Sequence, residues 1–184
     1  PEIPTVIVEA AAKDDVEIYG EYVGRIRAQQ FVEVRARVEG YLEQMLFAEG
    51  TYVNKNQVLF VINQEQYRAK ADKARAQLKK DEAQALKAQR DFERIKPLYA
   101  QNAASQLDLD NAEAAYESAM ATVAMSEADL AQAEMELGYT LVRSPLSGHI
   151  SERNVDLGTL VGPGAKSLLA TIVKSDTVLV DFNM

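Results

Sequence analysis

The chain has 184 residues, of which 47% are hydrophobic, a composition typical of a folded protein with one or two domains. Its 28 acidic residues outnumber the 20 basic ones and give a net charge of −8, which argues against a nucleic-acid partner, because such partners need clustered Lys and Arg. Zero cysteines exclude disulfides, thiolate metal sites and thiol catalysis, and no run of about 18 apolar residues is present to span a membrane.

Residues 1–63 are rich in β-branched and aromatic residues. The stretches "TVIVEA", "VEIYGEYVG", "FVEVRARVEG" and "VLFVIN" alternate partly between apolar and polar residues and are separated by glycines or polar residues. This pattern predicts short strands joined by turns.

Residues 64–137 consist mainly of strong helix formers and contain no glycine. Apolar or small residues recur there at alternating spacings of four and three, which predicts two helices that pack along a coiled-coil seam. The predicted seam positions are Tyr67, Ala71, Ala74, Leu78, Asp81, Ala85, Ala88, Phe92, Ile95 and Tyr99, then Leu109, Ala112, Tyr116, Ala119, Val123, Ser126, Leu130, Ala133 and Leu137, with Asp81 as a polar interruption.

Pro97 is the only proline in this region, and it marks the expected tip of an antiparallel helical hairpin. Proline is costly inside a helix but is tolerated near an end. Ser105 is expected to cap the second helix, with Asp108 in its first turn. Each arm is then on the order of 50 Å long at about 1.5 Å per residue.

Strand patterns return after Gly138, and they repeat those of the first region. With a shift of 108 residues, "VRARVEGYLEQMLFAEGTYV" from Val34 aligns with "VRSPLSGHISERNVDLGTLV" from Val142, after which the alignment slips by about one residue. Two similar halves on either side of a hairpin predict an α+β chain in which one small β domain is split by the helical insertion.

This arrangement resembles the periplasmic adaptors, or membrane fusion proteins, of tripartite efflux pumps, in which a lipoyl-like β-sandwich is interrupted by an α-helical hairpin. The resemblance assigns residues 32–63 and 138–174 to the two lipoyl-like halves and 64–137 to the hairpin. Residues 1–31 are then N-terminal strands of the membrane-proximal or β-barrel region, and 175–184 begin the β-barrel. The family pattern continues well beyond Met184, so a truncated protein is expected, with its inner-membrane anchor outside this sequence.

The tip carries the most specific part of the resemblance. Adaptors that work with resistance-nodulation-division (RND) transporters have an Arg, a Leu four residues later and a Ser seven residues further on, and this chain has Arg94, Leu98 and Ser105. The resemblance implies that these residues dock onto a TolC-type outer-membrane channel, that the partner in the inner membrane is an RND transporter, and that the full-length protein forms a periplasmic ring, expected to be a hexamer. No enzymatic activity or cofactor is implied.

Other interpretations remain open on the sequence alone. Adaptors of ABC-type pumps and of type I secretion systems share features of this pattern, and a coiled-coil assembly protein needs only the hairpin. Asp72-Lys73-Ala74 is similar to the triplet around a lipoylated or biotinylated lysine, but Lys73 is predicted inside a helix, whereas a carrier lysine needs a β-turn. His149 is the only histidine and is expected to be structural, because metal sites and acid-base catalysis need several convergent groups.

Overall fold

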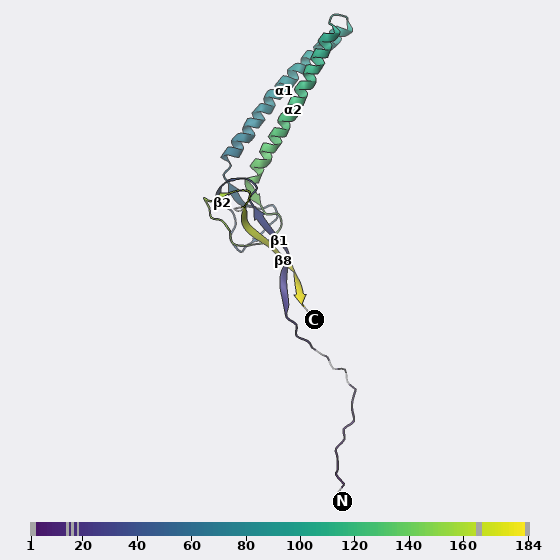
Figure 1. Cartoon of the computed structure of the whole chain (residues 1–184), viewed down its shortest axis with the longest axis vertical. Helices are drawn as coiled ribbons and strands as arrows, with labels where there is room; N and C mark the ends of the chain where they lie inside the picture. The colour runs from purple at the N-terminus through teal and green to yellow at the C-terminus, as the bar shows by residue number, and fades with distance from the viewer. Residues whose placement is uncertain (1–2, 14, 16, 18, 165–166, 183–184) are drawn as a thin grey trace.

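The computed structural model describes residues 3–13, 15, 17, 19–164 and 167–182. The chain is elongated: a long helical hairpin lies at one end, followed by a small β body and a two-stranded ribbon, and an extended N-terminal segment reaches to the other end (Figure 1). The elements follow in the order β1 (Gly24–Arg35), β2 (Gly40–Met45), β3 (Tyr52–Val53), β4 (Val58–Ile62), α1 (Glu65–Ala100), α2 (Gln106–Tyr139), β5 (Leu141–Arg143), β6 (Gly148–Ile150), β7 (Leu160–Val161) and β8 (Leu168–Phe182).

The β body consists of two four-stranded antiparallel sheets, with strand orders β1-β8-β6-β3 and β5-β4-β2-β7. Each sheet takes two strands from before the hairpin and two from after it. Exchanging the halves, so that β1 becomes β5 and β2 becomes β6, converts one strand order into the other. The predicted split domain is therefore confirmed, and its halves are interleaved rather than set side by side.

Backbone geometry confirms the internal repeat. Gly50 and Gly158 occupy equivalent turns with φ of 75° and 82°, a conformation that favours glycine. The N–H of Gly50 donates to the carbonyl of Ile150 at 3.0 Å, and the N–H of Gly158 donates to that of Leu42 at 2.8 Å. The later slip is two residues rather than one, because the connection that precedes β8 is two residues longer than the one that precedes β4.

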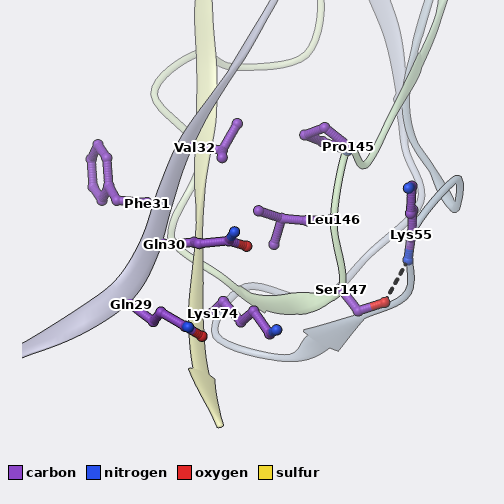
Figure 2. A pocket seen from close by; sticks show the side chains of 9 residues that line it. All are labelled: Gln29, Gln30, Phe31, Val32, Lys55, Pro145, Leu146, Ser147 and Lys174. Atoms are coloured by element: carbon purple, nitrogen blue, oxygen red, sulfur yellow. Dashed lines mark hydrogen bonds between the residues drawn. The ribbon is translucent and has the colours of Figure 1, made fainter. Parts of the chain in front are cut away.

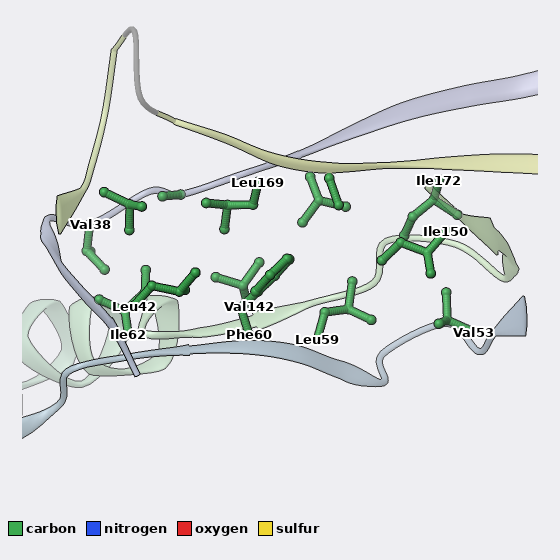
Figure 3. Close-up of a cluster of buried hydrophobic side chains, with 14 residues drawn as sticks. Val38, Leu42, Val53, Leu59, Phe60, Ile62, Val142, Ile150, Leu169 and Ile172 are labelled. Atoms are coloured by element: carbon green, nitrogen blue, oxygen red, sulfur yellow. The ribbon is translucent and has the colours of Figure 1, made fainter. Parts of the chain in front are cut away.

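The sandwich core is formed by aliphatic side chains from both sheets around Phe60 (Figure 3). Phe47 packs edge-on against the Phe60 ring, with centroids 5.1 Å apart. Gly40 and Gly148, which are equivalent in the repeat, lie where a Cβ would come within 2.6 Å of Ile62 Cγ2 and of the Val173 carbonyl oxygen, respectively. Neighbouring strands of the same half, β2 with β4 and β6 with β8, thus approach closely at these points and leave no room for a larger residue without a shift.

The predicted strands in residues 1–23 are not observed in the described part of that segment, and the first strand begins at Gly24. Strand-forming residues need a neighbouring strand to pair with, and side chains such as Ile7 and Val23 are almost fully exposed. Beyond the sandwich, β1 continues alongside β8 as a ribbon, and their register shifts between Ala28 and Gln30. Asn183 and Met184, the end of the predicted barrel segment, lie outside the described residues.

The hairpin has the predicted seam. Every buried residue of α1 and α2 occupies a predicted seam position, and most are small: Ala71, Asp81, Ala85, Ala112, Ala119, Val123, Ser126 and Ala133. Ion pairs tie the two helices together near the sandwich, where Lys70 Nζ lies 2.7 Å from Glu136 Oε2 and Arg75 NH2 lies 2.7 Å from Glu134 Oε1. No helix in the described ranges combines the length and apolarity needed to cross a bilayer.

Candidate functional site at the hairpin tip

The end of α1 is a tight backbone turn built from local hydrogen bonds. Asn102 adopts a left-handed conformation with φ of 58°. Its N–H donates to the Tyr99 carbonyl at 2.9 Å, and the next N–H, of Ala103, donates to the Leu98 carbonyl at 2.8 Å. This pair of bonds is the Schellman motif, and asparagine is one of the few non-glycine residues that tolerate the position. Pro97 lies in the last turn of α1, as expected for a proline at the tip.

The start of α2 is fixed by a reciprocal capping box, as the sequence predicts. Ser105 Oγ accepts from the Asp108 N–H at 3.2 Å, and the Ser105 N–H donates to Asp108 Oδ2 at 3.0 Å. Ser105 Oγ also donates to the same carboxylate oxygen at 2.6 Å. The bonds from the Ser105 side chain and then from its backbone hold the pKa of Asp108 below its usual value. The five-residue loop is therefore held at both ends.

The three predicted docking residues lie on this rigid end, although no hydrogen bond joins them among the described residues. Arg94 and Leu98 are four residues apart on one face of α1, and Ser105 begins α2 across the loop. The Arg94 side chain is 71% exposed, with one nitrogen 3.0 Å from Asp91 Oδ1. Leu98 is 40% exposed, which is unusual for a leucine that would otherwise close the hairpin core.

Two further apolar side chains are exposed at the tip: Leu107, which was not singled out from the sequence, and Tyr99, which was predicted as a seam position. Leu107, in the first turn of α2, is 67% exposed, and Tyr99 is 38% exposed. Leu107 falls outside the seam spacing, and a leucine at such a position was the signal in the sequence that could have predicted an exposed apolar side chain at the tip. Just below the tip, the rings of Phe92 and Tyr116 stack with centroids 6.2 Å apart and support the end of the hairpin from within.

The rest of the described chain offers no catalytic or metal-binding cluster. No group of three or more His, Asp or Glu residues there could hold a metal ion. His149 packs edge-on against Tyr52, and its Nδ1 lies 3.2 Å from Ser175 Oγ. Lys73 is exposed within α1 rather than on a turn.

An open groove of about 770 Å³ lies beside the bend of β1 (Figure 2). Its lining includes Phe31, Lys55, Ser147 and Lys174, and the Lys55 N–H donates to Ser147 Oγ at 2.9 Å (Figure 2). The groove holds no pair of groups arranged for proton transfer or nucleophilic attack. The tip is therefore the candidate functional site.

Residues 30–173 match the family model described as RND MFP, barrel-sandwich hybrid domain, where MFP stands for membrane fusion protein. The chain belongs to this family. Among curated proteins, this RND membrane fusion protein is 40% identical to the efflux pump periplasmic linker BepD of Brucella suis over 100% of its own length and 46% of that protein's. It is 33% identical to the multidrug efflux pump subunit AcrA of Escherichia coli over 98% of its own length and 45% of that protein's.

Solved structures show the same architecture. A MacA–MexA chimera that contains the α-hairpin domain of Pseudomonas aeruginosa MexA superimposes with a TM-score of 0.60 at 28% identity, over 82% of this chain and 50% of the chimera. The membrane fusion protein Spr0693 of Streptococcus pneumoniae gives a TM-score of 0.65 at 21% identity, over 85% of this chain and 67% of that chain. The RND membrane fusion protein described here spans about half the length of the curated relatives it matches.

Proposed function

We propose that the chain is the sandwich-and-hairpin part of a periplasmic adaptor that bridges an inner-membrane RND transporter and a TolC-type outer-membrane channel. The observation that carries this proposal is the tip, where Arg94 and Leu98 are exposed in the last turns of α1, next to a loop held by two capping motifs. Such a site has the exposure and rigidity that a docking contact needs. The role is mechanical, and no step of it requires catalysis or a cofactor.

The hairpin acts as a spacer between the two membranes. With 36 residues, α1 is about 54 Å long at about 1.5 Å per residue. Alanines in the seam let the helices approach closely, and the cross-hairpin ion pairs of Lys70 and Arg75 add local restraint near its base. The tip is thereby presented far from the sandwich, on an arm too slim to obstruct its neighbours.

Each docking residue contributes a different kind of contact. Arg94 offers the guanidinium nitrogens that Asp91 does not engage, and these donate charge-assisted hydrogen bonds to an acidic or carbonyl group of the channel. Leu98 supplies an apolar contact at the end of α1, and Leu107 exposes a second leucine in the first turn of α2. Ser105 already donates its hydroxyl proton to Asp108, so it meets the channel as an acceptor.

The charges of the hairpin support self-association into a ring, with a hexamer as the expected form. α2 carries eight acidic side chains and no basic one, whereas α1 carries ten basic and six acidic side chains. The acidic helix of one copy is thus complementary to the basic helix of the next. Along α2, exposed residues without charge recur at heptad spacing, so the α2 helix of one copy can pack closely against a neighbouring copy at these positions without charge repulsion. These residues are Leu107, Asn111, Ala114, Ser118, Ala121, Met125, Ala128, Gln132 and Met135.

The RND type is favoured over the ABC-type and type I secretion alternatives by the matched family model. The carrier alternative is disfavoured because Lys73 lies within α1. The periplasm as location, with anchoring to the inner membrane through a part of the protein outside this chain, follows from the bridging role.

The decisive experiment compares two charge reversals on α1 in the full-length protein. Arg94→Asp should abolish drug efflux and cross-linking to the channel, because it removes a donor and introduces repulsion at a small end-on contact. Lys79→Asp is the matched control, since Lys79 is an exposed residue of the same helix about four turns from Arg94. Both variants should keep the thermal stability of the parent protein, because exposed charges, including the exposed ion pair of Arg94 with Asp91, contribute little to it.

The docking role is rejected if Arg94→Asp pumps and cross-links like the parent. It is also rejected if both substitutions impair efflux equally, because the effect would then follow from the charge of the helix and not from the tip.

A further inference from the structure

The polar interruptions of the two seams meet in the middle of the hairpin. Asp81 on α1 is 8% exposed and Ser126 on α2 is 3% exposed. Ser126 Oγ donates to the Asp81 carboxylate, and Gln77 Nε2 donates to both of its oxygens at 3.0 and 2.9 Å. A carboxylate buried between two helices is thus held by neutral donors, one of which comes from the opposite helix.

These bonds favour the charged form of the buried group. The bond from Ser126 first, and that from Gln77 second, lower the pKa of Asp81 from its ordinary value. Asp81 is therefore ionised at neutral pH although it lies in the seam. A protein with well-packed apolar residues at such a position is often as stable as one with a buried charged group, or more stable. A contribution to stability therefore does not by itself explain why Asp81 and Ser126 occupy the seam.

The surrounding seam specifies the alignment of the two helices weakly. Most of its buried residues are alanines, which form shallow knobs that fit one heptad position almost as well as the next. The helices are anchored to each other near the sandwich, where Gln64 Nε2 donates to Thr140 Oγ1 at 2.7 Å and Arg75 pairs with Glu134, and near the tip through the Phe92–Tyr116 stack and the loop. Asp81 and Ser126 lie near the middle of their helices, between these two sets of contacts.

We propose that the Asp81–Ser126 pair fixes the longitudinal register of the hairpin and thereby positions its tip. A slip of one heptad would place Asp81 against Ala119 or Ala133, neither of which has a side-chain donor. Leaving a buried carboxylate without its cross-helix bond is strongly unfavourable. The native register is thus favoured because the registers shifted by one heptad leave Asp81 without this bond. A single polar residue specifies the register of coiled coils in the same way.

The register determines where the tip stands. A one-heptad slip displaces one helix along the other by about 10 Å, at about 1.5 Å per residue, and would force the five-residue loop and its caps to rearrange. The consequence for channel docking rests on the proposed function, whereas the register itself does not. Asp81 and Ser126 are accordingly positioning residues that act on the tip through helix alignment.

The test uses engineered cysteine pairs, which are clean because the chain has no cysteine. Arg75→Cys with Glu134→Cys, joined by a short bifunctional thiol reagent, reports the native register, because Arg75 and Glu134 form an ion pair across the hairpin. Arg75→Cys with Glu127→Cys reports a one-heptad slip. Each pair is combined with Asp81→Ala/Ser126→Ala, and with Asp81→Asn as the conservative variant whose side-chain oxygen still accepts from Ser126.

In the parent and in Asp81→Asn, cross-linking should occur only at the native pair. In the double alanine variant, the slipped pair should cross-link as strongly as the native pair, with unchanged helix content by circular dichroism. If the folded double variant cross-links only at the native pair, the proposal is wrong. If that variant loses helix content, the pair serves stability and the proposal is also wrong. Efflux by the full-length variants is read separately: register loss with normal efflux would refute the link to docking and leave the register role standing.

Discussion

Replacing Ser105 by alanine should destabilise the hairpin by about 1 kcal/mol, through loss of the N-cap of α2. The substitution removes Oγ, which accepts from the Asp108 N–H at 3.2 Å and donates to the Asp108 carboxylate at 2.6 Å. The Ser105 backbone N–H keeps its own bond to that carboxylate at 3.0 Å. N-cap replacements of this kind cost about 0.5–2 kcal/mol, and the surviving half of the capping box keeps the expected value near the middle.

The assay is thermal denaturation followed by far-ultraviolet circular dichroism. A loss of about 1 kcal/mol corresponds to a decrease in Tm of about 2–4 °C when the whole 184-residue chain unfolds as one cooperative unit. Ser105→Asn is the matched variant, because asparagine caps helices about as well as serine and should keep the parent Tm. Ser105→Asn then reports on docking alone, since it changes the shape of the tip while the cap is kept.

Two results would refute this reasoning. An unchanged Tm for Ser105→Ala would mean that the capping box contributes no stability at the tip. Equal losses for the alanine and asparagine variants would mean that the size of residue 105, and not its hydrogen bonding, sets the stability of the turn.

The remaining predictions concern other parts of the chain. Intact-mass analysis of the protein from its native host should show no lipoyl or biotinyl group on Lys73, which lies in a helix; a matching mass increase on its peptide would contradict this. Gly148→Ala should destabilise the sandwich by about 1–3 kcal/mol in urea denaturation, because its Cβ would meet a backbone carbonyl at 2.6 Å, whereas Gly138→Ala, with nothing within 4 Å in α2, should stabilise by about 1 kcal/mol. Acid should weaken the hairpin through Asp108: its folded pKa is lowered, so its contribution is complete above the ordinary value of 3.8 and is lost as the pH falls through the lowered value. Asp108→Asn should therefore show a smaller acid-induced decrease in Tm than the parent, and an equal decrease would exclude this carboxylate as the cause.

The hairpin could be predicted from the sequence in detail because its determinants are local. The four-three spacing identified every residue that is buried in the two helices, and Ser105 with Asp108 marked the start of the second helix. Helix periodicity and capping depend on neighbours within one or two turns. The exposure of Arg94 at the tip follows from the same reasoning, whereas its docking role remains a proposal.

The parts that could not be predicted depend on distant partners. Residues 5–10 have strand composition but form no strand, because composition does not state whether a neighbouring strand is present. The meeting of Asp81 with Ser126 could not be derived from the periodicity of either helix, since it depends on how the two are aligned. The interleaving of the halves was likewise hidden, because the repeat shows that two units are similar and not how their strands pair.

The interleaved sheets make the hairpin a participant in the folding of the sandwich. Neither half contains a complete sheet, so β4 must pair with β5 on the far side of the hairpin, whose hydrogen-bonded base residues Gln64 and Thr140 are 76 residues apart. Closing a flexible loop of that length costs roughly 3 kcal/mol more entropy than closing a tight turn, at about 0.6 kcal/mol for each doubling of length. A helical hairpin forms from local contacts and does so quickly. Once the two helices have packed together, their ends at the sandwich hold the strands before the hairpin close to the strands after it. The sandwich then assembles as if a short turn joined its two halves.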